Sequence, residues 1–391
     1  MSLDIVVVGA GLPGLLAAWR LAESGMKVAV FERGRIGSES SSLAAGHVPQ
    51  DSMSRENLAL LRRTREIIDE LDRITGGVTR FNVVGGIQLA TGQDGAEGLH
   101  NRAQLSEEVG GIGDILEPHE IARRFPQIYV EDLVAGYYTT DDGFVRSLDL
   151  TTVLGSMARA AGVDIGEGCL VERVCIDDGS VKGVIVGGEL VKAPRVLVSA
   201  GAWSRPLLER SGVLLPTKSF VLQALMLVGV SLDIPFISEV EGDYYVMVRT
   251  PSTVLLGIPP RNFDIDPDRF SRDVQSEDQL HFLDLVTHRI PMLRAARPAG
   301  GWAGVLVATP DAWPLLGPFG PDGLFVATGL GGGGLQRLSG AEAVAQLIMG
   351  EMPFVDLVEC AASRFKRYDG QAFEFREKPF YYAETSPMRL R

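Results

Sequence analysis

The first 32 residues change twice in their pattern of hydrophobic positions, and the changes predict a strand, a helix and a second strand. Residues 4–8 form an almost unbroken apolar run, which predicts a buried strand. Residues 15–24 carry apolar side chains at helical spacing up to Gly25, and residues 27–31 predict another buried strand. Between the first strand and the helix lies the sequence Gly-Ala-Gly-Leu-Pro-Gly at 9–14. A glycine turn in this position is typical of nucleotide-binding folds.

Each residue of this turn has a physical reason to be there. Gly9 permits the tight turn, Gly11 lets a pyrophosphate approach the backbone, and Gly14 lets the helix pack closely on the strand. The phosphates would then lie at the positive N-terminus of the helix. Glu32 follows Gly14 by eighteen residues (32 − 14), where a carboxylate accepts hydrogen bonds from the adenosine ribose. The order of these features predicts an adenine dinucleotide.

Further along the chain, the patterns predict an alternation of helices and strands that ends as it began. A long amphipathic helix is expected at 55–74, and residues 163–165, 170–176 and 181–186 suggest a small antiparallel group. The stretch 217–260 predicts short strands, followed by a helical region at 266–289. The strand at 324–327, a glycine loop and a helix at 335–349 have the same order of elements as the start of the chain. A dinucleotide fold that resumes near the end implies a second, inserted domain.

The loop at 328–336, Thr-Gly-Leu-Gly-Gly-Gly-Gly-Leu-Gln, indicates that the cofactor is a flavin and not a nicotinamide. Consecutive glycines let a backbone lie against a flat ring and point several N–H groups at it. A helix N-terminus at this position would stabilise the negative charge of a reduced flavin. A flexible surface loop is the alternative, but the buried strand before it and the apolar helix after it favour a fixed loop. A nicotinamide-dependent dehydrogenase would leave the loop unexplained.

Composition and charge exclude several classes of partner. The net charge of −13 over 391 residues and the absence of long basic runs argue against nucleic acid. Apolar stretches are short, so neither a membrane span nor a signal peptide is expected. The three cysteines form no C-x-x-C pair and no metal-binding spacing, which favours reduced thiols in a cytoplasmic protein and no metal site.

The ordered blocks of sequence resemble the D-amino-acid oxidase superfamily of FAD-dependent oxidoreductases, nearest its glycine oxidase and sarcosine oxidase branch. The blocks are the opening fingerprint and residues 40–46, 142–145, 162–165, 200–204, 302–311, 314–318 and 328–336. The resemblance implies an α/β fold with a Rossmann-like FAD-binding domain and an inserted mixed-sheet substrate domain. The FAD-binding domain would comprise residues 1–80, 141–215 and 300–375, and the substrate domain residues 81–140 and 216–299.

The resemblance also implies a set of FAD contacts. Beyond the fingerprint and Glu32, Arg33, Ser41 and Ser42 would lie along the phosphates, and Ala45, Gly46 and His47 near the isoalloxazine. Val171 would contact the adenine, and Ala200, Gly201 and Trp203 would lie beside the ribityl chain. The residues implied at the pyrimidine edge are Gly329, Gly332, Gly333, Gly334, Leu335 and Gln336. Some relatives attach FAD to a cysteine near the Thr-Pro-Asp block or to a histidine before the Ala-Ala-Gly turn. Residues 304–308 contain no cysteine and residues 40–43 no histidine, so noncovalent FAD is expected.

Departures from the family pattern concern the substrate. Many relatives that oxidise amino acids carry an arginine after the Trp-Ala-Gly block, where it pairs with the substrate carboxylate; here the residue is Leu306. Where the family pattern often has a histidine in the final loop, this sequence has Gly333. Where it usually has a proline in the last helix, this sequence has Ser339. An Arg-Gly-Gln run in the middle strand survives only as Gln223. The expected carboxylate anchor is therefore missing or moved.

Four residues are candidates for contact with substrate. Arg337 is expected in the first turn of the last helix, where a cation is disfavoured unless an anion lies beside it; a solvent-facing arginine is the alternative. Tyr245 and Arg249 are four apart on a predicted strand and so share a face, although a purely structural tyrosine is also common. His47 either faces the pocket or packs beside the flavin, and packing is favoured.

The leading hypothesis is FAD-dependent oxidation of the C–N bond of a small amine or amino acid that is glycine-, sarcosine- or proline-like. Hydride would pass to flavin N5 and the resulting imine would hydrolyse, so positioning and electrostatics are the main tasks of the protein. A flavin-carrying or regulatory subunit of a larger dehydrogenase complex is the alternative, motivated by the missing arginine. A partner subunit or a homo-oligomer is left open.

Overall fold

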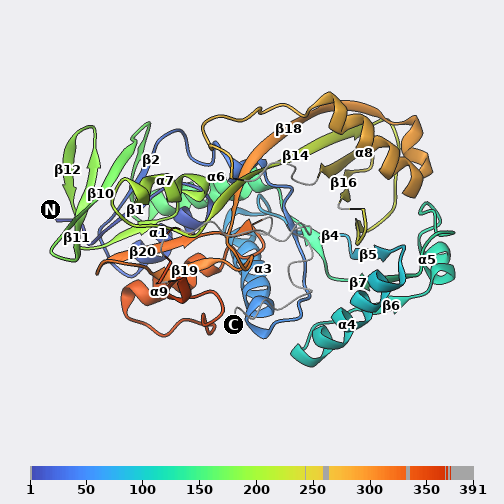
Figure 1. Ribbon diagram of the computed structural model, residues 1–391, viewed down its shortest axis with the longest axis horizontal. Coiled ribbons are helices and arrows are strands. Elements are labelled where there is room, and N and C mark those ends of the chain that lie inside the picture. Colours follow the sequence, from blue (N-terminus) through green and yellow to red (C-terminus); the bar gives the residue numbers. More distant parts are fainter. Residues whose placement is uncertain are drawn as a thin grey trace.

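The computed structural model describes residues 2–242, 244–258, 264–331, 335–365, 367–368 and 370. Figure 1 shows an elongated molecule in which two groups of strands and helices lie side by side. One group is built around a six-stranded sheet and the other around an eight-stranded sheet. The expected α/β class, with both parallel and antiparallel pairing, is confirmed.

The six-stranded sheet contains the opening strands at its centre. Its order is β19 (Leu315–Pro318), β20 (Leu324–Thr328), β13 (Val196–Val198), β1 (Ile5–Val8), β2 (Val28–Glu32) and β9 (Asp164–Glu167). Every pairing is parallel except that of β19 with β20. Ile5 and Val7 pack on one face while Val6 and Val8 pack on the other, as strand alternation requires. Burial on both faces explains why β1 is apolar at every position.

Helices cover one face of this sheet and a small sheet covers the other. The first face holds α1 (Leu12–Glu23), α3 (Arg55–Thr75), α6 (Ser147–Ala160) and α9 (Gly340–Met349). The opposite face holds α7 (Ser204–Glu209) and the antiparallel sheet of β10 (Val171–Asp177), β11 (Ser180–Val186) and β12 (Glu189–Lys192). The prediction that residues 163–165 belong to this antiparallel group is wrong, because β9 pairs in parallel with β2.

The eight-stranded sheet is mixed. Its order is β18 (Arg297–Ala308), β14 (Lys218–Val228), β17 (Thr253–Ile258), β16 (Tyr245–Thr250), β15 (Phe236–Glu239), β5 (Gly86–Ala90), β7 (Ala135–Thr139) and β6 (Asp114–Leu116). Only β15 and β5 pair in parallel. The helices near it are α4 (Gln93–Val109), α5 (Pro118–Arg124) and α8 (Ser276–Arg289), with the turn η2 (Pro291–Ala295). The short strands expected at 217–260 are present as β15, β16 and β17, but β14, which also lies in this stretch, is longer, with 11 residues.

A small three-stranded sheet lies where the two groups meet. It contains β3 (His47–Val48), β8 (Gly143–Phe144) and β4 (Asn82–Val83), and α2 (Ser40–Leu43) precedes β3. The remaining short helices are η1 (Gly201–Trp203) and η4 (Ala362–Phe365). Among the described helices none is long and apolar enough to cross a membrane. The domain boundaries inferred from the sequence stay a prediction, although β18 continues its pairing with β14 beyond residue 300, to Ala308.

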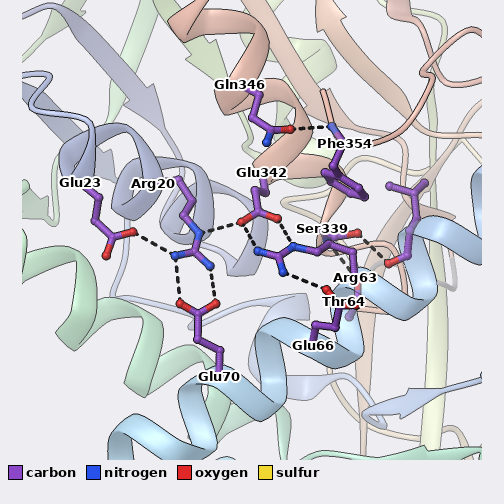
Figure 2. Close-up of polar contacts among 11 residues, drawn as sticks. Arg20, Glu23, Arg63, Thr64, Glu66, Glu70, Ser339, Glu342, Gln346 and Phe354 are labelled. Carbon is purple, nitrogen blue, oxygen red and sulfur yellow. Dashed lines mark hydrogen bonds and ion pairs between the residues drawn. The ribbon is translucent and has the colours of Figure 1, made fainter. Parts of the chain in front are cut away.

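Ion pairs fasten α1, α3 and α9 together (Figure 2). Glu342 on α9 accepts from Arg20 Nε at 2.8 Å and from Arg63 Nε and Nη2 at 2.6 and 2.9 Å. Arg20 on α1 also pairs with Glu70 of α3 at 2.6 Å. The hydrogen bond to Glu342 raises the pKa of Arg63. This cluster fixes α1, whose N-terminus follows the glycine turn, against α9.

The predicted ends of several helices need correction. The first helix begins at Leu12, directly after Gly11, and not at residue 15. The region expected to be helical at 266–289 becomes helix only at Ser276. The last helix begins at Gly340, because residues 335–339 form turns; Arg337 therefore precedes the helix and does not lie in its first turn.

Candidate active site

A cavity of about 600 Å³ lies between the two large sheets. One wall comes from the carboxyl ends of β1, β2, β13 and β20 and the loops that follow them, which is where parallel α/β sheets bind ligands. The opposite wall, here called the sheet wall, comes from β14, β15, β16 and β18. It consists of Leu222, Gln223, Ala224, Phe236, Tyr245, Trp302, Gly304, Val305, Leu306 and Val307.

The glycine turn at the start of α1 is closely packed. Gly9 has φ +102°, and a Cβ there would lie 2.6 Å from the carbonyl oxygen of Ser199. A Cβ at Gly14 would overlap the carbonyl oxygen of Gly9, so the helix packs directly on the turn. Gly11 lines the cavity, and Ser41 Oγ beside it accepts from the N–H of Leu12 at 2.9 Å. The positive N-terminus of α1 is therefore presented to the cavity without a bulky side chain over it.

Glu32, at the end of β2, is fixed by backbone groups. Its Oε2 accepts from the N–H of Ala10 at 2.9 Å and its Oε1 from the N–H of Gly34 at 2.8 Å. The residue also lines the cavity. Each carboxylate oxygen can accept more than one hydrogen bond, so this orientation leaves capacity for ribose hydroxyls.

Arg33 is held differently from the expectation that it runs along phosphates. Its Nη1 donates to Asp268 Oδ1 at 2.6 Å, and its guanidinium lies 3.8 Å from the ring centre of Trp203. Trp203 Nε1 donates to the same oxygen at 2.8 Å. The hydrogen bond from Arg33 holds the pKa of Asp268 below its ordinary value. All three residues line the cavity, so the arginine is present there but paired with a carboxylate.

The structure brings most residues of the expected site to this one cavity. The lining includes Gly9, Gly11, Glu32, Arg33, Ser41, Ala45, Gly46, His47, Val171, Ala200, Gly201, Trp203, Tyr245, Gly329, Leu335 and Gln336. Gly14 and Ser42 lie outside the lining, and Gly332, Gly333 and Gly334 lie outside the described residues. The lining residues of segments 9–47, 171, 200–203, 329–331 and 335–336 are far apart in sequence, so their meeting is a property of the fold.

Apart from Gln223, the sheet wall consists of aromatic, aliphatic and glycine residues. The rings of His47 and Phe236 stack with centres 3.7 Å apart and an interplanar angle of 4°, and Phe236 stacks on Tyr245 at 5.5 Å. Burial raises the pKa of Tyr245, which keeps the phenol neutral. Trp302 Nε1 donates to the carbonyl of Leu43 at 2.9 Å, so its ring is fixed in the wall. No Lys, Arg, Asp or Glu occurs in the sheet wall as defined above.

The two arginines expected near the substrate do not line the cavity. Arg249 shares a strand face with Tyr245, as predicted, since its guanidinium lies 4.5 Å from the ring centre of Phe144 in the same cluster. Its Nη1 donates to the carbonyl of Ala45, and burial lowers its pKa. Arg337 is buried elsewhere, where its Nε donates to Asn57 Oδ1 at 2.7 Å. The structure therefore places Arg337 away from the cavity.

Three residues of the site escaped the sequence reasoning. Phe236 and Asp268 lie in segments without a local motif, so no signal in the sequence marks them. Asp142 belongs to the Asp-Gly-Phe-Val block, but the block predicts only a turn. Its Oδ2 lies 3.3 Å from His47 Nε2, a contact that depends on the pairing of β3 with β8.

These features fit an FAD. The glycine turn at the N-terminus of α1 suits the pyrophosphate of a flavin dinucleotide, and the fixed carboxylate of Glu32 suits its ribose. Val171 and Gly329 line the same cavity. Residues 4–347 match the family described as DAO, FAD dependent oxidoreductase, and the chain belongs to this family. It is therefore an FAD-dependent oxidoreductase, and the resemblance stated from the sequence is confirmed.

Individual relatives resemble this chain in sequence and in fold. The glycine oxidase of Geobacillus kaustophilus is 27% identical over 342 residues, which cover 83% of this chain and 87% of the relative. Its solved structure has a TM-score of 0.82 at 26% identity, covering 93% and 99% of the two chains. L-proline dehydrogenase from P. horikoshii has a TM-score of 0.85 at 21% identity, covering 94% and 98%.

A longer relative is the mitochondrial dimethylglycine dehydrogenase of Rattus norvegicus, 24% identical over 395 residues. The match covers 93% of this chain but only 45% of the relative, so the chain spans less than half of that protein. The chain therefore corresponds in length to glycine oxidase, and to one part of the dehydrogenase.

Proposed function

We propose that this oxidoreductase oxidises the C–N bond of a small amine or amino acid that carries an apolar substituent. The observation that carries the proposal is the sheet wall, whose rings and aliphatic side chains include no charged residue. Leu306 stands in this wall at the position where the family resemblance implies a carboxylate-binding arginine. A substrate group that lies against such a wall must itself be apolar, because burying an unpaired charge there is costly.

The relatives support a small substrate. Glycine oxidase, dimethylglycine dehydrogenase and L-proline dehydrogenase are named for small amino acids that are primary, tertiary and secondary amines. The apolar wall of this chain favours the N-alkylated and cyclic members of that range over glycine.

We further propose that FAD is bound noncovalently. The cavity lining has no cysteine among the described residues, and His47, the histidine in it, is stacked on Phe236. Bound FAD supplies the acceptor for a hydride from the carbon next to the amine nitrogen. The task of this chain is to hold that carbon in place, to exclude water with the sheet wall, and to keep the amine neutral. Acid precipitation tests the linkage: yellow colour must stay in the supernatant, and colour in the pellet contradicts the proposal.

The deciding experiment is anaerobic bleaching of the flavin absorbance by matched pairs of compounds. Each pair consists of an N-alkylated or cyclic amino acid and its decarboxylated amine, with glycine as the small reference. We expect an N-alkylated or cyclic compound to bleach the flavin faster than glycine. If glycine is the best substrate, the wall does not select apolar groups. If no amine reduces the flavin, the alternative of a flavin-carrying subunit gains support, and co-purification of a partner would strengthen it.

Other expectations remain proposals of the same kind. A cytoplasmic location is supported by the three free thiols, Cys169, Cys175 and Cys360. Cell fractionation tests it directly. Association with a partner subunit or a second copy is open to measurement by light scattering of the purified protein.

A further inference from the structure

A histidine and a carboxylate meet in the interior beside the sheet wall. His47 begins β3 and pairs with Phe144 of β8, and Asp142 immediately precedes that strand. His47 Nε2 lies 3.3 Å from Asp142 Oδ2. Only 12% of the His47 side chain and 8% of the Asp142 side chain are exposed, and His47 is one of the residues that line the cavity. Among the described residues, His47 is the ion-pair partner of this buried carboxylate, and a buried charge needs a partner.

The surroundings of Asp142 hold its carboxylate in one orientation. Its Oδ1 accepts from the N–H of Gln50 at 2.9 Å, and its backbone carbonyl accepts from Val84 and Gly85, each at 2.9 Å. A Cβ at position 86 would overlap the carboxylate, so Gly86 leaves the space that this orientation needs. The strands around the cavity therefore aim Oδ2 at the imidazole.

The imidazole is fixed as well. Its ring lies parallel to Phe236 with centres 3.7 Å apart, and this contact opposes a flip of the ring about the Cβ–Cγ bond. Nε2 is buried and has no hydrogen bond of good geometry to a described residue. It lies 3.3 Å from Asp142 Oδ2. A ring nitrogen that faces a carboxylate carries the hydrogen, since two lone pairs would repel each other. In the neutral ring the other nitrogen, Nδ1, then holds the lone pair.

We propose that His47 and Asp142 form the proton-accepting pair of the cavity, which takes the proton from the substrate's ammonium group. This inference rests on the proposed function. The N–H bond of the ammonium breaks and its electron pair stays on the amine nitrogen, while a new N–H bond forms at His47 Nδ1. Asp142 remains a carboxylate and stabilises the imidazolium. The step involves no oxidation, and it provides the neutral amine from which a hydride can leave.

The other titratable groups near the ring do not replace this pair. Tyr245 stacks on Phe236 with ring centres 5.5 Å apart, and burial raises its pKa, so its phenol stays protonated and does not accept the proton. Arg249 donates to the carbonyl of Ala45 in the segment before His47 and already carries a positive charge. His47 is therefore the catalytic residue of the inference, and Asp142 is its positioning residue.

Nuclear magnetic resonance of ¹⁵N-histidine-labelled protein tests the arrangement without turnover. The chain has five histidines, and His47→Gln assigns the ring in question. We expect the Nε2–H form of His47, and we expect Asp142→Asn to change its ring nitrogen shifts. A matched control is His288→Gln, because His288 also lies by an aspartate, Asp132 at 2.9 Å, but is 56% exposed and outside the cavity. An Nδ1–H form of His47 overturns the proposal.

The rate of anaerobic flavin reduction as a function of pH tests the role. His47→Gln should slow reduction by about 100-fold at pH 7, and the loss should vanish at high pH, where the amine is already neutral. Asp142→Asn should move the acidic limb of the profile to lower pH, because the imidazolium loses its counter-ion, whereas His288→Gln should change nothing. A loss that is equal at every pH means a packing role and overturns the pair, while the proposed function stands. A wild-type protein that no amine reduces overturns both.

Discussion

Replacing Glu342 by Gln removes a charge from the centre of the ion-pair cluster of α1, α3 and α9 (Figure 2). The side chain is only 8% exposed and accepts three hydrogen bonds from Arg20 and Arg63. Glutamine keeps the volume, so the packing of α9 is unchanged. Its amide offers one acceptor oxygen and brings an NH₂ group towards guanidinium groups that can only donate. The perturbation is therefore electrostatic.

The magnitude follows from what the two arginines retain. Removing one partner of a buried ion pair costs about 3–5 kcal/mol when the other charge is left alone. Here Arg20 keeps Glu23 and Glu70, and Arg63 keeps Glu66. We therefore expect about 2–3 kcal/mol, close to the value of one charged hydrogen bond. With an unfolding entropy of about 0.8 kcal/mol/K for a chain of this length, Tm falls by about 3 °C.

The assay is thermal unfolding at one fixed excess of FAD, because a bound ligand shifts Tm by mass action. The control is Glu23→Gln, which also removes a carboxylate from Arg20, but one that is 46% exposed. Exposed pairs contribute about 0–1 kcal/mol, so its Tm should fall by less than about 1 °C. If the two variants lose the same stability, burial does not set the strength of this cluster and the reasoning is refuted.

Three further predictions concern the cavity. Gly11→Val should abolish FAD binding, because its side chain would meet Ser41 and occupy the space of the phosphates; a folded variant with full flavin content contradicts the placement of the cofactor. Leu306→Arg should favour a carboxylate substrate over its decarboxylated amine by at least about 30-fold in KM, or about 2 kcal/mol; an unchanged ratio means that position 306 does not face the substrate. Arg249→Met should reduce kcat/KM for both members of a pair by about tenfold, since it removes a charged donor from Ala45; a loss confined to carboxylates would instead show direct contact.

The sequence predicts those parts of the fold and site that depend on neighbouring residues. Gly9, Gly11 and Glu32 belong to one contiguous strand-turn-helix-strand unit, and the structure places all three on the cavity. The position of Tyr245 and Arg249 on the same face of β16 follows from strand periodicity alone. Local periodicity also predicts β1 and β2, which are neighbours in the six-stranded sheet.

What the sequence does not predict depends on partners distant in the chain. The strand at Asp164–Glu167 looks like its antiparallel neighbours, but its partner is β2, more than a hundred residues earlier. Arg337 lies in a stretch with helical periodicity, yet its turn is set by tertiary bonds, such as that to Asn57. The contact of His47 with Asp142 needs the pairing of β3 with β8, which no spacing in the sequence encodes.

The order of strands in the six-stranded sheet has a consequence for biosynthesis. β1 and β2 leave the ribosome first, but the other neighbour of β1 is β13, and β13 in turn needs β20, which ends at Thr328. At translation rates of about 5–20 residues per second, β20 is synthesised roughly 15–60 s after the glycine turn. During that time the apolar edge of β1 is open to aggregation. We therefore expect FAD to be captured only by nearly complete chains, so that riboflavin supply during expression governs the yield of folded protein.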